Sequence, residues 1–187
     1  MLHELGANVL LVDYRGFGRS EGSPTEEGVY KDADAILDFV LNSQTINNKD
    51  IIVLGHSLGG AVAIDLANRR GEEITGLVVE NTFSSLREMA YKFHPEMRRF
   101  SWFLDLLQRR YMSNIDKVRT LKVPTLFLCG RKDQSIPPEH TDRLFEVRAG
   151  SPYPELREAT SCRPQTYLTP LVLSVAPLWT GYAGGIL

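Results

Sequence analysis

The sequence predicts an α/β fold with a mostly parallel sheet, and three observations support this. Short apolar runs recur along the chain, segments with helical spacing separate them, and 43% of the 187 residues are hydrophobic. The runs are continuous rather than alternating, which is typical of strands buried on both faces of a parallel sheet. Alternating strands and helices favour right-handed crossovers within one sheet, with helices on both of its faces.

The expected strands are Val9–Val12, Ile51–Leu54, Leu77–Val79 and Thr125–Leu128. After the first strand, Ser23 should cap a helix, with Pro24 at its first position and Glu26 completing a capping box. The apolar face of this helix would consist of Ile36, Leu37, Val40 and Leu41.

Residues 84–112 interrupt this rhythm with aromatic side chains interleaved with arginines. The segment is too long for a simple connection, so we interpret it as a short helical lid over the sheet. An ordinary pair of crossover helices is the alternative.

The chain divides into a partial domain, residues 1–148, and a divergent segment, residues 149–187. From Pro164 to Leu187 there is no charged residue and no clear period, and Pro170 and Pro177 interrupt the segment. We expect a non-native or disordered tail here, rather than the strand and helix that should close the sheet. A weakly membrane-inserting tail is the alternative.

Composition narrows the possible functions. A formal net charge of −2 argues against nucleic acid as a partner, because phosphate binding needs a basic face. The two cysteines, Cys129 and Cys162, form neither a disulfide framework nor a zinc site. We therefore expect a reducing compartment and no metal.

The strongest motif is Gly55-His-Ser-Leu-Gly59, which matches Gly-x-Ser-x-Gly. A predicted strand precedes it and a helical segment, Ala61–Ala67, follows, as a nucleophile elbow requires. Ser57 would then stand at the carboxyl edge of the sheet as a nucleophile. The Leu58 amide, at the helix start, would stabilise an oxyanion.

A serine nucleophile needs a base and an acid that orients the base. In the α/β-hydrolase fold the chain order is serine, acid, histidine. Asp133 follows a predicted strand on a loop and is the expected acid, with Glu80, at the end of an earlier strand, as the alternative. No cofactor is required.

The base is harder to assign, because no histidine follows position 140. His3 lies in the opening segment, His56 is the variable residue of the elbow, and His94 lies in the proposed lid. His140 could act only if the Pro137-Pro138 turn placed it between Asp133 and Ser57. The chain is therefore expected to lack its general base.

With these residues identified, the chain resembles the BEM-type (bud-emergence) serine hydrolases, the branch that includes alpha/beta hydrolase domain-containing protein thirteen. The resemblance covers about residues 1–148. The matching stretches are Asn8–Gly22, Thr25–Tyr30, Gly55–Ala63, Val79–Phe83 and Asp133–Pro138.

This resemblance implies Ser57 as nucleophile, Asp133 as acid and an esterase or thioesterase activity that extends to S-acylated proteins. It also implies a membrane anchor, the first strands and a Gly-Asn-rich oxyanion loop, all expected before Met1 and absent from this sequence. The family's Gly-x-His-Asn segment should follow about residue 155, where Pro154–Pro164 stands instead.

Two functional hypotheses follow. The first is a serine hydrolase whose partners are small acyl esters, thioesters or S-acylated proteins. The second is a catalytically inactive fragment or interaction module. The family implies membrane anchoring, whereas this sequence shows no clear anchor, so we expect a cytoplasmic or peripheral location.

Overall fold

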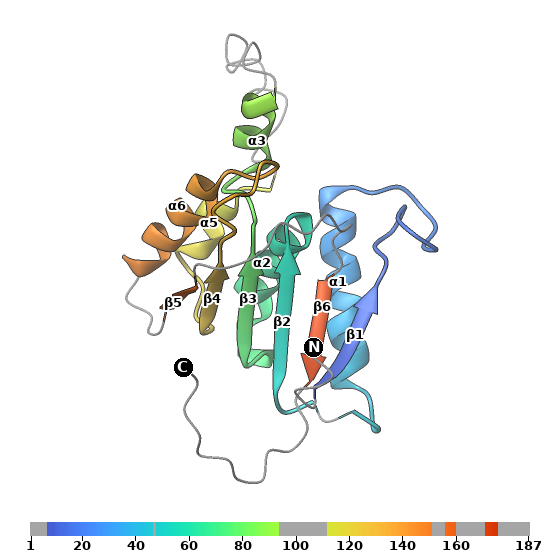
Figure 1. Ribbon diagram of the computed structural model, residues 1–187. Coiled ribbons are helices and arrows are strands. Elements are labelled where there is room, and N and C mark those ends of the chain that lie inside the picture. Colours follow the sequence, from blue (N-terminus) through green and yellow to red (C-terminus); the bar gives the residue numbers. More distant parts are fainter. Residues whose placement is uncertain (1–6, 47, 94–111, 151–155, 160–170, 176–187) are drawn as a thin grey trace.

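The computed structural model describes residues 7–46, 48–93, 112–150, 156–159 and 171–175 (Figure 1). The strands in these ranges belong to one sheet with the order β1-β6-β2-β3-β4-β5. Their bounds are β1 Asn8–Val12, β2 Ile51–His56, β3 Gly76–Glu80, β4 Thr125–Leu128, β5 Leu156–Ala159 and β6 Leu171–Val175. The four strands that the sequence predicted are therefore confirmed, each within two residues of the expected bounds.

The helices lie between these strands, as the alternation predicted. Their bounds are α1 Glu26–Leu41, α2 Leu58–Arg70, α3 Leu86–Phe93, α5 Asn114–Val118 and α6 Pro138–Ala149, with a 3₁₀ turn, η2, at Gly71–Glu73. Strands β2 to β5 pair in parallel, whereas β6 is antiparallel to both of its neighbours.

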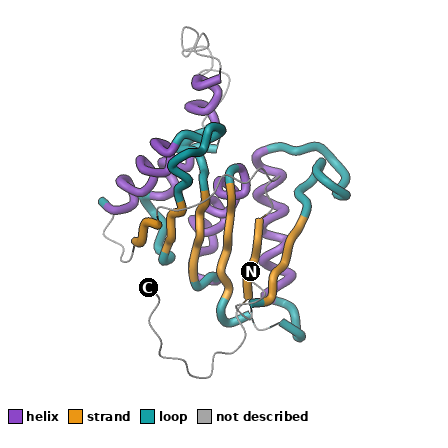
Figure 2. Tube along the Cα trace, viewed as in Figure 1, coloured by secondary structure: helices purple, strands orange, loops and turns teal. Residues whose placement is uncertain are grey.

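The described helices form one layer on the sheet. Each crossover from β1 through β2, β3 and β4 to β5 moves in the same direction, so right-handed connections place their helices on the same face. Helix α1 contacts α2, α2 contacts α5, and α5 contacts α6, and Figures 1 and 2 show α1 and α2 behind the strands. Helices on the second face, which the sequence also predicted, are not among the described residues.

The strand residues that face the helix layer are more buried than those on the other face of the sheet. In β2, Ile51 and Val53 are fully buried, whereas Ile52 and Leu54, on the opposite face, are half-buried. Leu11 of β1 lies in register with Leu54 across β6 and is 59% exposed. The core therefore lies between the sheet and its helix layer, since side chains in register across a sheet share a face.

The start of α1 differs from the sequence-based prediction. Thr25, not Ser23, is the N-cap, and its side-chain oxygen accepts from the Gly28 amide at 3.1 Å. Glu26 is the first helical residue, so it does not complete a capping box. Threonine is also a favoured N-cap residue, and Thr25 is the residue directly before the helix. The cap is therefore two residues later in the sequence than expected.

Two of the described strands lie within residues 149–187, the segment for which we expect a non-native or disordered tail, and that expectation stays a prediction. β5 pairs in parallel with β4 and closes that edge, although its sequence, Leu156-Arg-Glu-Ala159, has no apolar pattern. β6 is an apolar run between prolines that fills the space between β1 and β2. The other residues of 151–187 lie outside the described part of the chain.

The predicted lid is described only in part. Helix α3 lies beyond the carboxyl ends of the strands (Figure 1), and Ser85 and Ser113 form an isolated bridge at the base of the segment. Residues 94–111 lie outside the described ranges, so the lid stays a prediction.

Among the described residues, β1 stands at one end of the sheet, and its outer side pairs with no described strand. A strand edge of this kind can pair with another chain.

The two-sided pairing of β6 predicts a specific sensitivity to proline. Leu173→Pro removes an amide from a strand paired with both β1 and β2, and a carbonyl left unsatisfied costs about 1–3 kcal/mol. We expect urea unfolding of Leu173→Pro to show a lower midpoint than that of Leu173→Ala, which keeps the amide. Equal midpoints for the two variants would contradict the placement of β6.

Candidate active site

Ser57 joins β2 to α2 with a strained backbone, at φ 52° and ψ −117°. A positive φ is uncommon for any residue with a Cβ and costs of order 1–3 kcal/mol. The Ser57 amide donates to the Glu80 carbonyl at 3.0 Å, and its carbonyl accepts from Thr82 Oγ1 at 2.7 Å. Ser57 therefore has the backbone geometry of the predicted elbow, and residues at the end of β3 hold both of its peptide groups.

Two glycines make this turn possible. A Cβ on Gly55 would overlap the backbone of Gly59, and a Cβ on Gly60 would lie 2.7 Å from the Thr82 side chain. The close approach of β2, α2 and β3 therefore depends on positions that have no side chain. This explains Gly55 of the motif, and Gly60 directly after it, by contact rather than by flexibility.

Leu58 is the first residue of α2, as its predicted role requires. The first amides of a helix have no partner within the helix and point along its positive end. An oxyanion formed beside Ser57 would face this end of α2. The role of the Leu58 amide in stabilising it stays a prediction.

Asp133 lies on the loop that follows β4, at the same edge of the sheet as Ser57. Its Oδ1 accepts from the amides of Ser135 at 2.7 Å and Ile136 at 3.0 Å, and its own amide donates to the Gly130 carbonyl at 2.9 Å. These bonds fix the orientation of the carboxylate. The structure places it where an acid is expected, and its role in the reaction stays a prediction.

Glu80, the alternative acid, is the last residue of β3. Its carbonyl accepts from the Ser57 amide, so its backbone already contributes to the elbow. Its position beside His56 of β2 in the parallel ladder leaves it at the carboxyl edge as well. Asp133 differs in having a carboxylate held by two amides.

His140 does not lie between Asp133 and Ser57. Its Nδ1 is 2.8 Å from Ser84 Oγ and 3.8 Å from Glu88 Oε2, while the Ser84 hydroxyl also donates to Glu88. Asp133 Oδ1 meanwhile binds backbone amides. The contacts of His140 in this structure are therefore with Ser84 and Glu88, and the absence of a general base stays a prediction. His56 ends β2, and His3 and His94 lie outside the described residues.

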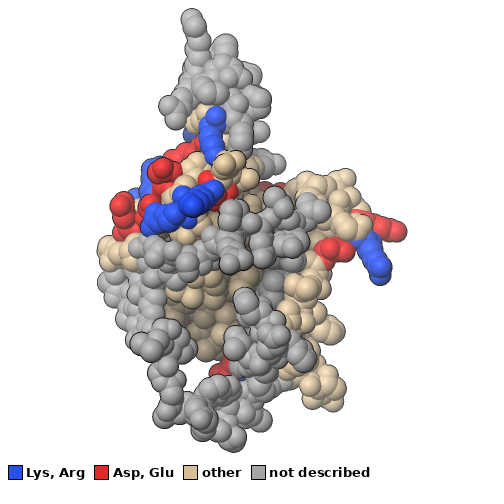
Figure 3. All heavy atoms as spheres, in the orientation of Figure 1, with Lys and Arg blue, Asp and Glu red and all other residues tan. Residues whose placement is uncertain are grey.

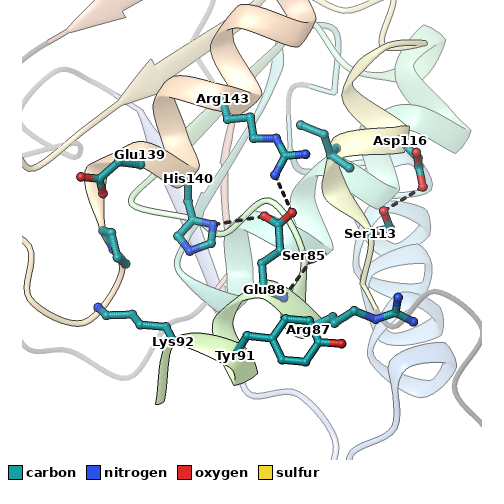
Figure 4. Close-up of a pocket in the computed structure, with 12 residues that line it drawn as sticks. Ser85, Arg87, Glu88, Tyr91, Lys92, Ser113, Asp116, Glu139, His140 and Arg143 are labelled. Atoms are coloured by element: carbon teal, nitrogen blue, oxygen red, sulfur yellow. Dashed lines mark hydrogen bonds and ion pairs between the residues drawn. The ribbon is translucent and has the colours of Figure 1, made fainter. Parts of the chain in front are cut away.

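His140 instead lines a cavity of about 810 Å³ between α3, α5 and α6 (Figure 4). Arg143 binds Glu88 across its wall at 2.5 Å, and Ser113 donates to Asp116 at 2.8 Å. Burial lowers the pKa of His140 below its usual value, although Glu88 opposes this shift. The shift favours the neutral imidazole. Neither Ser57 nor Asp133 lines this cavity.

On the face shown in Figure 3, charged side chains gather over α3 and α6 and around the loop after β1. Among the residues that the structure describes, no three His, Cys, Asp or Glu side chains are grouped as metal ligands would be. Within the same ranges, no helix is both long and apolar enough to cross a membrane.

Sequence reasoning missed the contribution of Asn81 and Thr82, which connect the site from the end of β3. Asn81 has a φ of 44° and accepts from the Gly130 amide at 2.6 Å, and Thr82 binds Ser57. The only signal was their place in Val79–Phe83, which belongs to the resemblance. The residue types of Asn81 and Thr82 do not indicate that the loop after β4 would contact this segment.

Comparison with known proteins agrees with this fold. Residues 1–118 match the family described as serine aminopeptidase, S33. The chain is 36% identical over 160 residues to the alpha/beta hydrolase domain-containing protein WAV2 of Arabidopsis thaliana, covering 80% of this chain and 51% of the relative. It is 36% identical to protein bem46 of Schizosaccharomyces pombe, covering 75% and 46%. These relatives confirm the resemblance to the BEM-type proteins.

A third relative, 33% identical over 77% of this chain and 50% of its own length, is the membrane protein YNL320W of Saccharomyces cerevisiae. Among solved structures, an alpha-beta hydrolase from Vibrio vulnificus matches with a TM-score of 0.64 at 24% identity, covering 79% of this chain and 54% of that chain. This likeness confirms the α/β-hydrolase fold. The chain spans about half the length of the curated relatives it matches.

The contact between Gly60 and Thr82 predicts that adding a methyl group at Gly60 destabilises the elbow. Gly60→Ala should lower stability by about 1–3 kcal/mol, because the Thr82 side chain or the Ser57 turn must shift. Gly71→Ala is a matched control, since its nearest neighbour would be 3.8 Å away. Chemical denaturation checks this, and equal stability of the two variants would contradict the tight elbow.

Proposed function

Because this chain belongs to the serine aminopeptidase S33 family of α/β hydrolases, we propose that it is a serine hydrolase of acyl esters and thioesters. The observation that supports this best is the strained Ser57 backbone, held on both sides by the end of β3. Strain of this kind is retained where a residue must point its side chain at a ligand. Ser57 is such a residue at the carboxyl edge of the sheet.

In the proposed reaction, Ser57 Oγ attacks the acyl carbonyl carbon while a base removes its proton. The resulting oxyanion lies at the amino-terminal end of α2, where the Leu58 amide can donate to it. Collapse of the intermediate breaks the C–O or C–S bond, and the leaving alcohol or thiol takes the proton. Water then releases the acid and regenerates Ser57. This chemistry needs a base to take the Ser57 proton but no metal or organic cofactor.

The substrates we propose are small acyl esters and thioesters, including S-acylated proteins. Membrane contact is part of this proposal, and the description of the yeast relative as a membrane protein supports it. Acyl chains and membranes occur together, so a site at the exposed carboxyl edge of the sheet suits such substrates.

A second candidate is a non-catalytic interaction module, and two observations favour it. His140 is engaged by Ser84 and Glu88 rather than by Asp133. Large apolar side chains are also exposed near β1 and on α1, among them Leu11 at 59% and Phe39 at 61%. An exposed apolar surface of this kind is one that another chain could cover.

Chemical rescue separates the two candidates. The whole chain would be treated with a fluorophosphonate probe with and without added imidazole, which can replace a missing base. We expect imidazole to accelerate the labelling of Ser57 on the order of tenfold to a hundredfold. A base positioned by the protein contributes about 10²–10⁴-fold, and free imidazole should reach at most the lower end of that range. Peptide mass mapping would locate the adduct.

Ser57→Ala is the control for this experiment and should abolish the adduct. Hydrolysis of p-nitrophenyl acetate and of a palmitoyl thioester would be measured alongside, subtracting the rate of imidazole with Ser57→Ala. The hydrolase proposal is refuted if labelling is unaffected by Ser57→Ala. Absence of any Ser57-dependent rate in imidazole would favour the interaction module.

A further inference from the structure

We infer that Asn81 is a positioning residue that sets the acid loop, residues 130–136, against the Ser57 elbow. This inference rests on the proposed function, since it assigns to Asn81 a part in aligning Asp133 with Ser57. It concerns a residue that contacts neither reacting group directly. Three sets of contacts support it.

The first set fixes Asn81 itself. Asn81 follows β3, is 7% exposed and has a left-handed backbone with φ 44°. Its amide donates to the Leu128 carbonyl at 3.0 Å, which extends the ladder between β3 and β4 by one bond. This fixed backbone aims the side chain across the ends of both strands.

The second set connects Asn81 to Asp133 through Gly130. Asn81 Oδ1 accepts from the buried Gly130 amide at 2.6 Å. The Gly130 carbonyl accepts from the Asp133 amide at 2.9 Å, so Gly130 is bound through both of its backbone groups. The loop therefore leaves β4 in a direction that Asn81 determines, and its turn back delivers Asp133.

The third set connects the same segment to Ser57. Glu80 and Thr82, the neighbours of Asn81, bind the amide and the carbonyl of Ser57. Three consecutive residues thus hold the nucleophile with their outer members and the acid loop with their central one. Catalytic groups must be held within about 0.5 Å of their working positions. A single segment that holds both Ser57 and the Asp133 loop fixes their relative position, whereas two separate segments could move relative to each other.

Other contacts hold the rest of the loop. Arg131, near its beginning, binds Asp142 of α6 through its side chain at 2.6 Å. Lys92 donates to the carbonyls of Gln134 and Ser135, at 2.9 and 3.1 Å, and Ile136 is buried. Loss of the Asn81 side chain would therefore release the Gly130 amide where the loop leaves β4, while the Arg131 side chain and the far end of the loop stay attached. The expected defect is misplacement of Asp133 rather than unfolding.

Asparagine satisfies two requirements at this position. Its backbone tolerates the left-handed region better than most residues do, and its side chain offers an acceptor. Glycine meets only the first requirement, whereas aspartate meets both. Asn81→Gly and Asn81→Asp are therefore a matched pair that separates backbone conformation from hydrogen bonding.

The test uses the full chain and two measurements on each variant. Hydrogen exchange followed by NMR reports protection of the Gly130 amide, and the rate of fluorophosphonate labelling in imidazole reports alignment at Ser57. In Asn81→Gly we expect lost protection of Gly130 and labelling slower by up to about a hundredfold, the cost of a misplacement near 1 Å. Asn81→Asp should restore protection and most of the labelling rate, while both variants keep a cooperative thermal transition.

The inference is overturned if Gly130 stays protected in Asn81→Gly, or if Asn81→Asp is as defective as Asn81→Gly in both measurements. A chain that is not labelled even without substitution would refute the proposed function instead. Gly130 protection in the two variants would then still decide whether Asn81 holds the loop.

Discussion

The Ser57 peptide groups are held at a strained φ by bonds from Glu80 and Thr82, and the rest of the site depends on this constraint. Without these bonds the residue before α2 would relax towards helical angles and its side chain would turn away from the sheet edge. The strain of about 1–3 kcal/mol is offset by two hydrogen bonds at about 1 kcal/mol each, and by packing that only glycine at positions 55 and 60 permits.

Topology explains why a strand end can serve this purpose. Because β2, β3 and β4 run in parallel, their carboxyl ends meet at one edge, and the loops after them come within hydrogen-bonding distance. The same single direction of crossovers gathers the described helices on one face. Leu11, on the other face of β1, is exposed for that reason. One connectivity therefore produces both the candidate site and the exposed apolar surface on β1.

The sequence predicted the features that are local and failed where distant segments meet. Val9–Val12 and Thr125–Leu128 were recognisable as strands because burial imposes continuous apolar runs. β5 was not, since Leu156-Arg-Glu-Ala159 is defined by pairing with β4 and has no pattern of its own. Ser57 and Asp133 followed from motif and chain order, whereas the position of His140 depends on Ser84 and Glu88, more than fifty residues earlier. Spacing along the chain contains no information about such contacts.

The central claim is that the end of β3 imposes the Ser57 conformation. A crystal structure of the chain, with the Ser57 backbone resolved, tests it most directly. The account predicts a positive φ at Ser57, with the Glu80 carbonyl and the Thr82 hydroxyl within hydrogen-bonding distance of its peptide groups. A helical φ at Ser57, with α2 beginning one residue earlier and Thr82 turned away, would contradict it.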